Sequence, residues 1–177
     1  MAESGFIVCV PEAEAMVGSL RERFDSSARL GVPAHVTVLF PFMSPENITA
    51  SVVQRIASVL REAQRFEFSL AKVARFPATA YLEPEPAATF IALTESLARE
   101  FPQFPPFGGE FPTIIPHLTV AHGSITEAEF AAAELASSLA LNGPIASACS
   151  SLVLMENSSG TWRQMHVFPL ARSHTAG

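Results

Sequence analysis

Two short segments of this sequence carry a histidine and a threonine at the same spacing. The first reads His35-Val36-Thr37-Val38 and the second reads His117-Leu118-Thr119-Val120. Both are rich in apolar and β-branched residues and bounded by Pro or Gly, so both are predicted to be short strands. Because side chains alternate across a strand, each histidine shares a face with its threonine. Each strand is therefore expected to bury its apolar face and to present a His-Thr pair on the other.

Two such pairs facing each other suit a displacement at a phosphate ester. One imidazole can take a proton from the attacking oxygen while the other protonates the leaving oxygen, because an unperturbed histidine pKa of about 6.5 allows both forms near neutral pH. The threonine hydroxyls can donate hydrogen bonds to the non-bridging oxygens, where negative charge must be stabilised. A single His-x-Thr is usually a structural histidine in a strand. Two equivalent copies instead favour a paired site.

The double motif resembles that of the two-histidine (2H) phosphoesterase superfamily, in its 2'-5' RNA ligase and cyclic phosphodiesterase branch. The resemblance implies that His35 and His117 are catalytic and that Thr37 and Thr119 bind phosphate. It implies a metal-independent phosphodiesterase that hydrolyses 2',3'-cyclic phosphates of RNA ends or nucleotides, usually to 2'-phosphates, with no cofactor and no metal. A related 2'-5' phosphodiesterase or RNA ligase activity stays open. Which histidine is the base does not follow from the sequence.

The predicted elements around the motifs recur in the same order. Strand, helix, His-strand, helix and strand occur once in residues 1–77 and again in 78–177, which indicates an internal duplication. Neither half can bury its own sheet alone, so we expect one bilobal α+β domain over 1–177, with lobes built mainly from these two repeats. A pseudo-two-fold axis would relate two antiparallel sheets lining a central cleft, with helices outside. The last elements are predicted to be a strand over 145–155 and a hairpin over 151–168.

Other residues are candidates for substrate contact. Phe40 follows the first motif, and Trp162 with Arg163 follows a Gly-containing turn. Bases of single-stranded nucleic acid stack on aromatic rings, with roughly 1–3 kcal/mol for each base. Most of the 14 phenylalanines must belong to the core instead, since they cannot all be ligands. Further flat surfaces that could serve are Tyr81, Phe107 and Phe111.

His122 departs from the pattern of the resembling family. Relatives of the RNA-ligase type commonly carry Arg five positions after the second motif histidine, where this chain has His122. Strict alternation would turn this side chain away from His117 and Thr119. It could reach the cleft if the strand ended near Ala121, which Gly123 permits because glycine tolerates unusual backbone angles. We expect either a supporting role in substrate binding or a histidine hydrogen-bonded at a strand end.

Composition limits the class of partner. The net charge of −6 argues against a protein that grips long nucleic acid through many phosphate contacts. No apolar run approaches the roughly 18 residues of a membrane span, and the N-terminus lacks the features of a signal peptide. Cys9 and Cys149 stand in apolar strand-like segments and are expected to be thiols. We therefore expect a cytoplasmic monomer whose partner is a small nucleotide or an RNA 3' end.

Two other functions are compatible with these residues. One is a module that binds phosphorylated nucleotides or RNA ends without turnover, for which arginines would be better suited than a His/Thr quartet. The other is a zinc enzyme using the histidines at 35, 117, 122 and 166, although none of these has the close ligand spacing of common zinc sites. His166 and His174 are otherwise expected on a strand surface and in the C-terminal tail.

Overall fold

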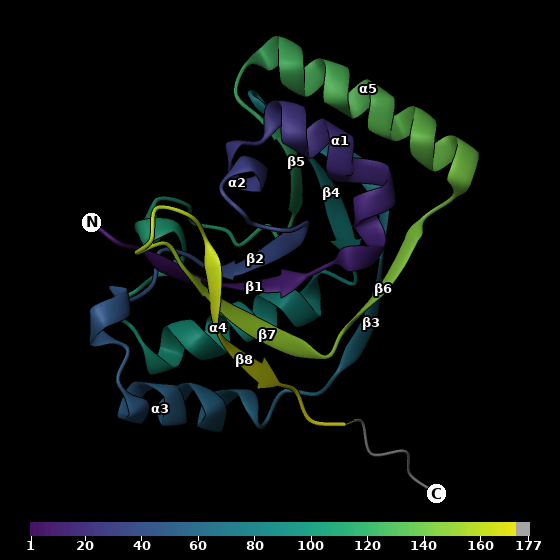
Figure 1. Ribbon diagram of the computed structural model, residues 1–177. Helices are drawn as coiled ribbons and strands as arrows, with labels where there is room; N and C mark the ends of the chain where they lie inside the picture. Colours follow the sequence, from purple (N-terminus) through teal and green to yellow (C-terminus); the bar gives the residue numbers. More distant parts are fainter. Residues whose placement is uncertain (173–177) are drawn as a thin grey trace, which may run out of the picture.

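The computed structural model describes residues 1–172; the segment 173–177, with His174, lies outside the described part. The described chain forms two four-stranded antiparallel sheets with helices outside them (Figure 1), which confirms the predicted α+β class. The strands are β1 (Ser4–Cys9), β2 (His35–Leu39), β3 (Phe66–Phe76), β4 (Thr79–Glu85), β5 (Leu118–His122), β6 (Ile145–Cys149), β7 (Ser151–Glu156) and β8 (Arg163–Pro169). The α-helices are α1 (Glu14–Phe24), α2 (Ser26–Arg29), α3 (Ala50–Leu60), α4 (Ala88–Glu100) and α5 (Ile125–Asn142). Short 3-10 turns are η1 (Pro11–Ala13), η2 (Pro45–Asn47) and η3 (Pro106–Gly109).

The sheets do not coincide with the two repeats. The first sheet has the order β2-β1-β7-β8 and the second the order β5-β4-β3-β6, so each repeat contributes strands to both. The lobes therefore differ from the predicted division into 1–77 and 78–177. After α3 the chain crosses to the second sheet as β3, and after α5 it enters the second sheet as β6 and crosses back as β7. The predicted strand over 145–155 is thus two strands in different sheets, divided at Ser150. The predicted hairpin is present as β7–β8.

The helices form two outer layers on opposite sides of the sheets. Helices α1 and α5 pack on the second sheet, and α4 packs on β2 of the first sheet with α3 beside it (Figure 1). A core cluster of apolar side chains fills the space between the layers and includes Val36, Val38, Leu118 and Val120 of the two His-strands. The predicted apolar face of each strand is therefore buried. Within residues 1–172, no helix is long and apolar enough to cross a membrane.

The first His-strand contains an extra residue relative to its neighbour. In the ladder between β1 and β2, Ile7 pairs with Thr37 and Phe6 pairs with Leu39, so Val38 has no partner. One unpaired residue in one of two antiparallel strands is a β-bulge. Beyond a bulge the alternation of side chains is reversed, because the side-chain period of the strand is two.

The second His-strand has its bulge at the equivalent residue. In the ladder between β4 and β5, Tyr81 pairs with Thr119 and Ala80 pairs with Ala121, which leaves Val120 without a partner. The two-fold repeat therefore extends to this irregularity of the backbone. The bulge lies three residues after the motif histidine in both strands, directly after the motif threonine.

Candidate active site

Each motif histidine is fixed by the backbone carbonyl two residues before it. Nδ1 of His35 lies 2.7 Å from the oxygen of Pro33, and Nδ1 of His117 lies 2.6 Å from the oxygen of Ile115. A carbonyl oxygen only accepts hydrogen bonds, so Nδ1 carries a proton in both rings. Nε2 then offers a lone pair when the imidazole is neutral and an N–H when it is charged. Both histidines are thereby set to exchange protons through the same atom, Nε2.

Burial favours the neutral form of both imidazoles. Loss of hydration lowers the pKa of His35 to about 4, with a further lowering by the positive charges of Arg21 and His117 and an opposing effect of Asp25 and of its own backbone hydrogen bond. Loss of hydration also lowers the pKa of His117, although its backbone hydrogen bond opposes the shift. The two strands that carry these histidines, β2 and β5, contact each other directly. A bound phosphate would raise both pKa values, because an anion stabilises the charged form.

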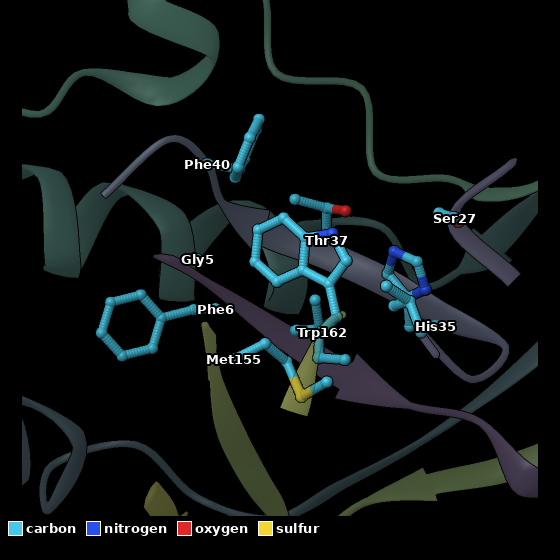
Figure 2. A pocket seen from close by; sticks show the side chains of 10 residues that line it. Gly5, Phe6, Ser27, His35, Thr37, Phe40, Met155 and Trp162 are labelled. Carbon is cyan, nitrogen blue, oxygen red and sulfur yellow. The ribbon is translucent and has the colours of Figure 1, made fainter. Parts of the chain in front are cut away.

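A pocket of about 220 Å³ opens beside His35 (Figure 2). The motif pair His35 and Thr37 shares this pocket with Phe40 and Trp162, the two aromatic residues predicted to contact substrate. The other lining residues are Gly5, Phe6, Ile7, Ser27, Val32 and Met155. Most of these side chains are apolar, and none is a lysine or an arginine. The pocket therefore suits a flat, uncharged group next to one His-Thr pair.

The second motif histidine lies among aromatic rings. The ring of His117 is 5.5 Å from that of Phe76, 5.2 Å from that of Tyr81 and 6.4 Å from that of Phe107, measured between centroids. The Phe76 ring stands at 90° to the imidazole, whereas the Phe107 ring is within 19° of parallel. These rings restrict the orientation of the imidazole. His117 and Thr119 do not line the pocket beside His35.

Because of the two bulges, the residue five positions after each motif histidine returns to the face of that histidine. In the first strand this residue is Phe40, which lines the pocket. In the second it is His122, which is exposed and pairs in the ladder with Thr79. Thr79 lies two residues before Tyr81, the ladder partner of Thr119, so His122 and Thr119 share a face. The expectation that alternation turns His122 away is wrong, and the bulge rather than an early strand end is the reason.

The two equivalent positions have opposite polarity. On the first side, the Phe40 ring lies 5.9 Å from that of Trp162 and packs over Gly5, where an added Cβ would come within 2.9 Å of Phe40 Cδ2. On the second side, the hydroxyl of Thr79 lies 2.8 Å from Nδ1 of His122. The site thus combines two similar His-Thr pairs with an apolar corner beside the first and a polar corner beside the second.

Arg163 is engaged elsewhere and does not line the pocket. Its guanidinium forms an ion pair with the carboxylate of Glu156 and lies 3.4 Å from the hydroxyl of Ser158. Hydrogen bonds from Ser158 and Arg163 hold the pKa of Glu156 at about 2. This cluster stabilises the β7–β8 turn, from which Trp162 donates its backbone N–H to the oxygen of Leu30 at 2.7 Å. In this structure, Arg163 supports the turn that carries Trp162.

A buried ion pair that the sequence did not reveal supports the loop before His35. The guanidinium of Arg21, 2% exposed, donates to the carboxylate of Asp25 at 3.0 and 3.1 Å and to the carbonyl of Val32 at 3.1 Å. Asp25 also accepts from the backbone N–H of Ser27 at 3.0 Å. The pair therefore fixes both ends of the segment that leads into β2. The only sequence signal for it is the spacing of four residues between Arg21 on α1 and Asp25 directly after that helix, and this spacing is common on helix surfaces.

In the described residues 1–172, no three histidine, cysteine or acidic side chains lie together as a metal site would require. His166, one of the histidines considered for zinc, pairs with Leu154 on the first sheet, and its ring lies 6.0 Å from that of Phe168. Cys9 and Cys149 are both free thiols. Burial raises the pKa of Cys149 to about 12, so this thiol stays protonated and unreactive near neutral pH.

Comparisons with known proteins agree with this description. Residues 9–161 match the sequence model of the 2'-5' RNA ligase superfamily. The fold is similar to that of TT0787 of Thermus thermophilus, at a TM-score of 0.62 and 16% identity over 97% of this chain and 100% of that one. It is also similar to E. coli LigT complexed with 3'-AMP (TM-score 0.59, 15% identity, 96% of this chain and 98% of that one) and to a protein described as a phosphoesterase (TM-score 0.57, 15% identity, 97% and 99%). A search of curated protein sequences found no match.

Proposed function

This chain belongs to the 2'-5' RNA ligase superfamily of 2H phosphoesterases, and from that premise we propose that it is a metal-independent cyclic phosphodiesterase. Its substrate would be a 2',3'-cyclic phosphate at an RNA end or on a small nucleotide, and its product a 2'-phosphate. The observation that carries this proposal is the matched pair of histidines, each with Nδ1 bound to a carbonyl and Nε2 left for proton transfer. We also propose that the protein acts as a cytoplasmic monomer.

In the proposed reaction, Nε2 of the neutral imidazole takes a proton from water as the water oxygen attacks phosphorus. The bond between phosphorus and O3' breaks, and Nε2 of the charged imidazole gives its proton to O3'. The 2'-phosphate remains, and the two histidines have exchanged protonation states. Thr37 and Thr119 lie on the faces of their histidines and would donate hydrogen bonds to the non-bridging oxygens. The acid, the base and the hydrogen-bond donors of this reaction are all side chains of this protein.

The asymmetry of the site supports one orientation of the substrate. The apolar corner beside His35, with Phe40 and Trp162, would take the base of the terminal nucleoside. The polar corner, with His122 hydrogen-bonded to Thr79, would contact phosphate or ribose oxygens. The absence of lysine and arginine from the pocket lining favours a substrate with few charges, such as a single phosphodiester, over a polyphosphate. E. coli LigT, which shares the fold, forms complexes with 3'-AMP, NADP+ and ATP, and these complexes are consistent with a nucleotide ligand.

The proposal is tested with a panel of 2',3'-cyclic nucleotides, RNA ends and 2'-5' dinucleotides, each assayed with and without chelator. We expect turnover of the cyclic phosphates to 2'-phosphates, unchanged by chelator and abolished in His117→Ala. Binding of the panel without turnover by the wild-type protein would show a binding module instead. Turnover restricted to 2'-5' dinucleotides would move the activity to 2'-5' phosphodiester hydrolysis.

A further inference from the structure

An aromatic surface lies beside the second motif histidine, outside the pocket that His35 lines. Phe107 and Phe111 form it, and we call it the aromatic shelf. Their rings are 5.9 Å apart between centroids and stand at 80° to each other. Phe107 is half-buried and Phe111 is 62% exposed, so the ring of Phe111 is open to a ligand. The Phe107 ring is nearly parallel to the ring of His117, so the shelf adjoins the second motif histidine.

Phe107 is held in a backbone conformation that residues with a side chain avoid. Its φ is 51° and its ψ is 35°, and within residues 1–172 it is the one residue other than glycine with a positive φ. The N–H of Phe107 donates to the carbonyl of Phe40 at 2.7 Å, which ties this loop to the first His-strand. Strained conformations of this kind persist where surrounding contacts impose them, and they concentrate at functional sites. Here the strain directs an aromatic ring toward His117.

The pocket beside His35 is too small for a substrate with two bases. Its volume of about 220 Å³ is below the roughly 300–1,000 Å³ of pockets that enclose a drug-sized ligand. One nucleoside base can occupy it against Phe40 and Trp162. Any further nucleotide must lie outside the pocket. Phe76 and Tyr81 also lie against His117, but Tyr81 is buried and Phe76 is half-buried, whereas Phe111 of the shelf is exposed. The shelf therefore offers the open ring on which a second base can stack.

We propose that the shelf binds a second base, so that the preferred substrate is an oligonucleotide end and not a mononucleotide. The proposal rests on the phosphodiesterase function given above and specifies its substrate class. The terminal base occupies the pocket, the cyclic phosphate lies between the two His-Thr pairs, and the preceding base stacks on Phe111. Stacking on an aromatic ring tolerates every base, because each base has a π-face. The shelf therefore selects substrate length and not sequence.

The kinetic test compares adenosine 2',3'-cyclic phosphate with the adenosine dinucleotide that ends in the same cyclic phosphate. We expect the wild-type protein to have the higher kcat/KM for the dinucleotide. Phe111→Ala should lower kcat/KM for the dinucleotide roughly 5- to 100-fold and leave that for the mononucleotide within about twofold. Phe111→Tyr keeps a flat ring and should retain the preference, whereas Phe111→Leu, apolar but not flat, should lose it. Phe130→Ala is the matched control, since Phe130 is another exposed phenylalanine, on the outer helix α5.

A binding measurement separates failure of this inference from failure of the proposed function. Trp162 is the single tryptophan and lines the pocket, so its fluorescence reports occupancy without turnover. Adenosine 2'-phosphate and the corresponding dinucleotide 2'-phosphate serve as ligands. If Phe111→Ala weakens binding of the dinucleotide 2'-phosphate but not of adenosine 2'-phosphate, a second base binds to the shelf, even if the protein hydrolyses no cyclic phosphate. If both ligands bind the variant as they bind the wild type, or both substrates lose activity equally, the shelf does not bind a second base.

Discussion

Oγ1 of Thr79 lies 2.8 Å from Nδ1 of His122, and this contact exists because Val120 is bulged out of the ladder between β4 and β5. Without the bulge His122 would point to the helix side of the sheet, with Leu118 and Val120. With it, His122 shares the face of Thr119, and Thr79 restrains its ring. The hydrogen bond occupies Nδ1, so Nε2 is the nitrogen that can contact a substrate.

The first prediction concerns this residue. His122→Ala should raise KM and change kcat little, because a residue that only binds phosphate or ribose oxygens stabilises ground and transition states alike. His122→Arg should be tolerated, since a guanidinium is a permanent phosphate donor. Thr79→Val, which removes the hydroxyl at nearly constant volume, should raise KM to a smaller extent.

Steady-state kinetics on the three purified variants decide the role of His122. Unchanged parameters in His122→Ala would reduce it to a histidine hydrogen-bonded at the end of its strand. A fall in kcat as deep as that of His117→Ala would place it in the chemistry.

The His-Thr pairs were predictable from the sequence because they depend on local alternation, and β2 and β5 bury Val36 and Leu118 as that alternation requires. The bulge was not predictable. Val120 is a β-branched apolar residue like its neighbours, and a bulged residue of this type leaves no local signal. The distribution of each repeat's strands over both sheets was not predictable either. Residues 145–155 have a continuous strand propensity, which does not indicate that the chain passes from the second sheet to the first at Ser150. The pairing of Arg21 with Asp25 depends on burial, which charge patterns alone do not indicate.

The second prediction concerns the two motif histidines as acid and base. His35→Ala and His117→Ala should each lower kcat by roughly 10²- to 10⁴-fold, because each removes one proton transfer. The double variant should be much less than multiplicatively worse, since the two residues act as a unit. His166→Ala, on β8, is the matched control and should keep the activity of the wild type. Turnover of His35→Ala within a few-fold of the wild type would remove His35 from the mechanism.

The third prediction is the pH dependence. The base must be neutral, so activity falls as pH drops below its pKa; the acid must be charged, so activity falls as pH rises above its pKa. Burial lowers the pKa of His35 to about 4 and lowers that of His117 below its usual range. Both limbs of the kcat/KM profile should therefore shift to the acid side, with an optimum below about pH 6.5. The pH profile of kcat, which reports the enzyme–substrate complex, should lie at higher pH, because the bound phosphate raises the pKa values of both histidines.

The same shift predicts a change in stability. His35 has a folded-state pKa below its unfolded value, so its neutral form stabilises the fold above about pH 6.5, and this contribution is lost as pH falls toward 4. Urea unfolding between about pH 4 and 7 should show the loss, and His35→Gln, which does not titrate, should flatten this part of the curve. For the activity profile of the preceding prediction, a kcat/KM optimum well above neutral pH in the wild type would contradict the neutral state assigned to His35 and His117.

The last prediction concerns the buried ion pair beside the site. Arg21 and Asp25 are 2% and 5% exposed, whereas Arg55 and Glu100 form an ion pair whose side chains are 48% and 35% exposed. Removing one partner of a buried pair leaves an uncompensated charge, so Asp25→Ala should lower the free energy of unfolding by about 3–5 kcal/mol. Glu100→Ala, the matched exposed variant, should lower it by about 0–1 kcal/mol. Urea unfolding monitored by far-UV circular dichroism measures both.

Replacing both partners by apolar residues separates charge burial from the geometry of the loop. The double variant Arg21→Met with Asp25→Leu buries no unpaired charge, so it should recover part of the stability that Asp25→Ala loses. It also removes the hydrogen bonds to Val32 and Ser27 that fix the segment before His35. Its kcat should therefore stay below that of the wild type although the protein is folded. A double variant with wild-type kcat would show that the ion pair stabilises the fold without positioning His35.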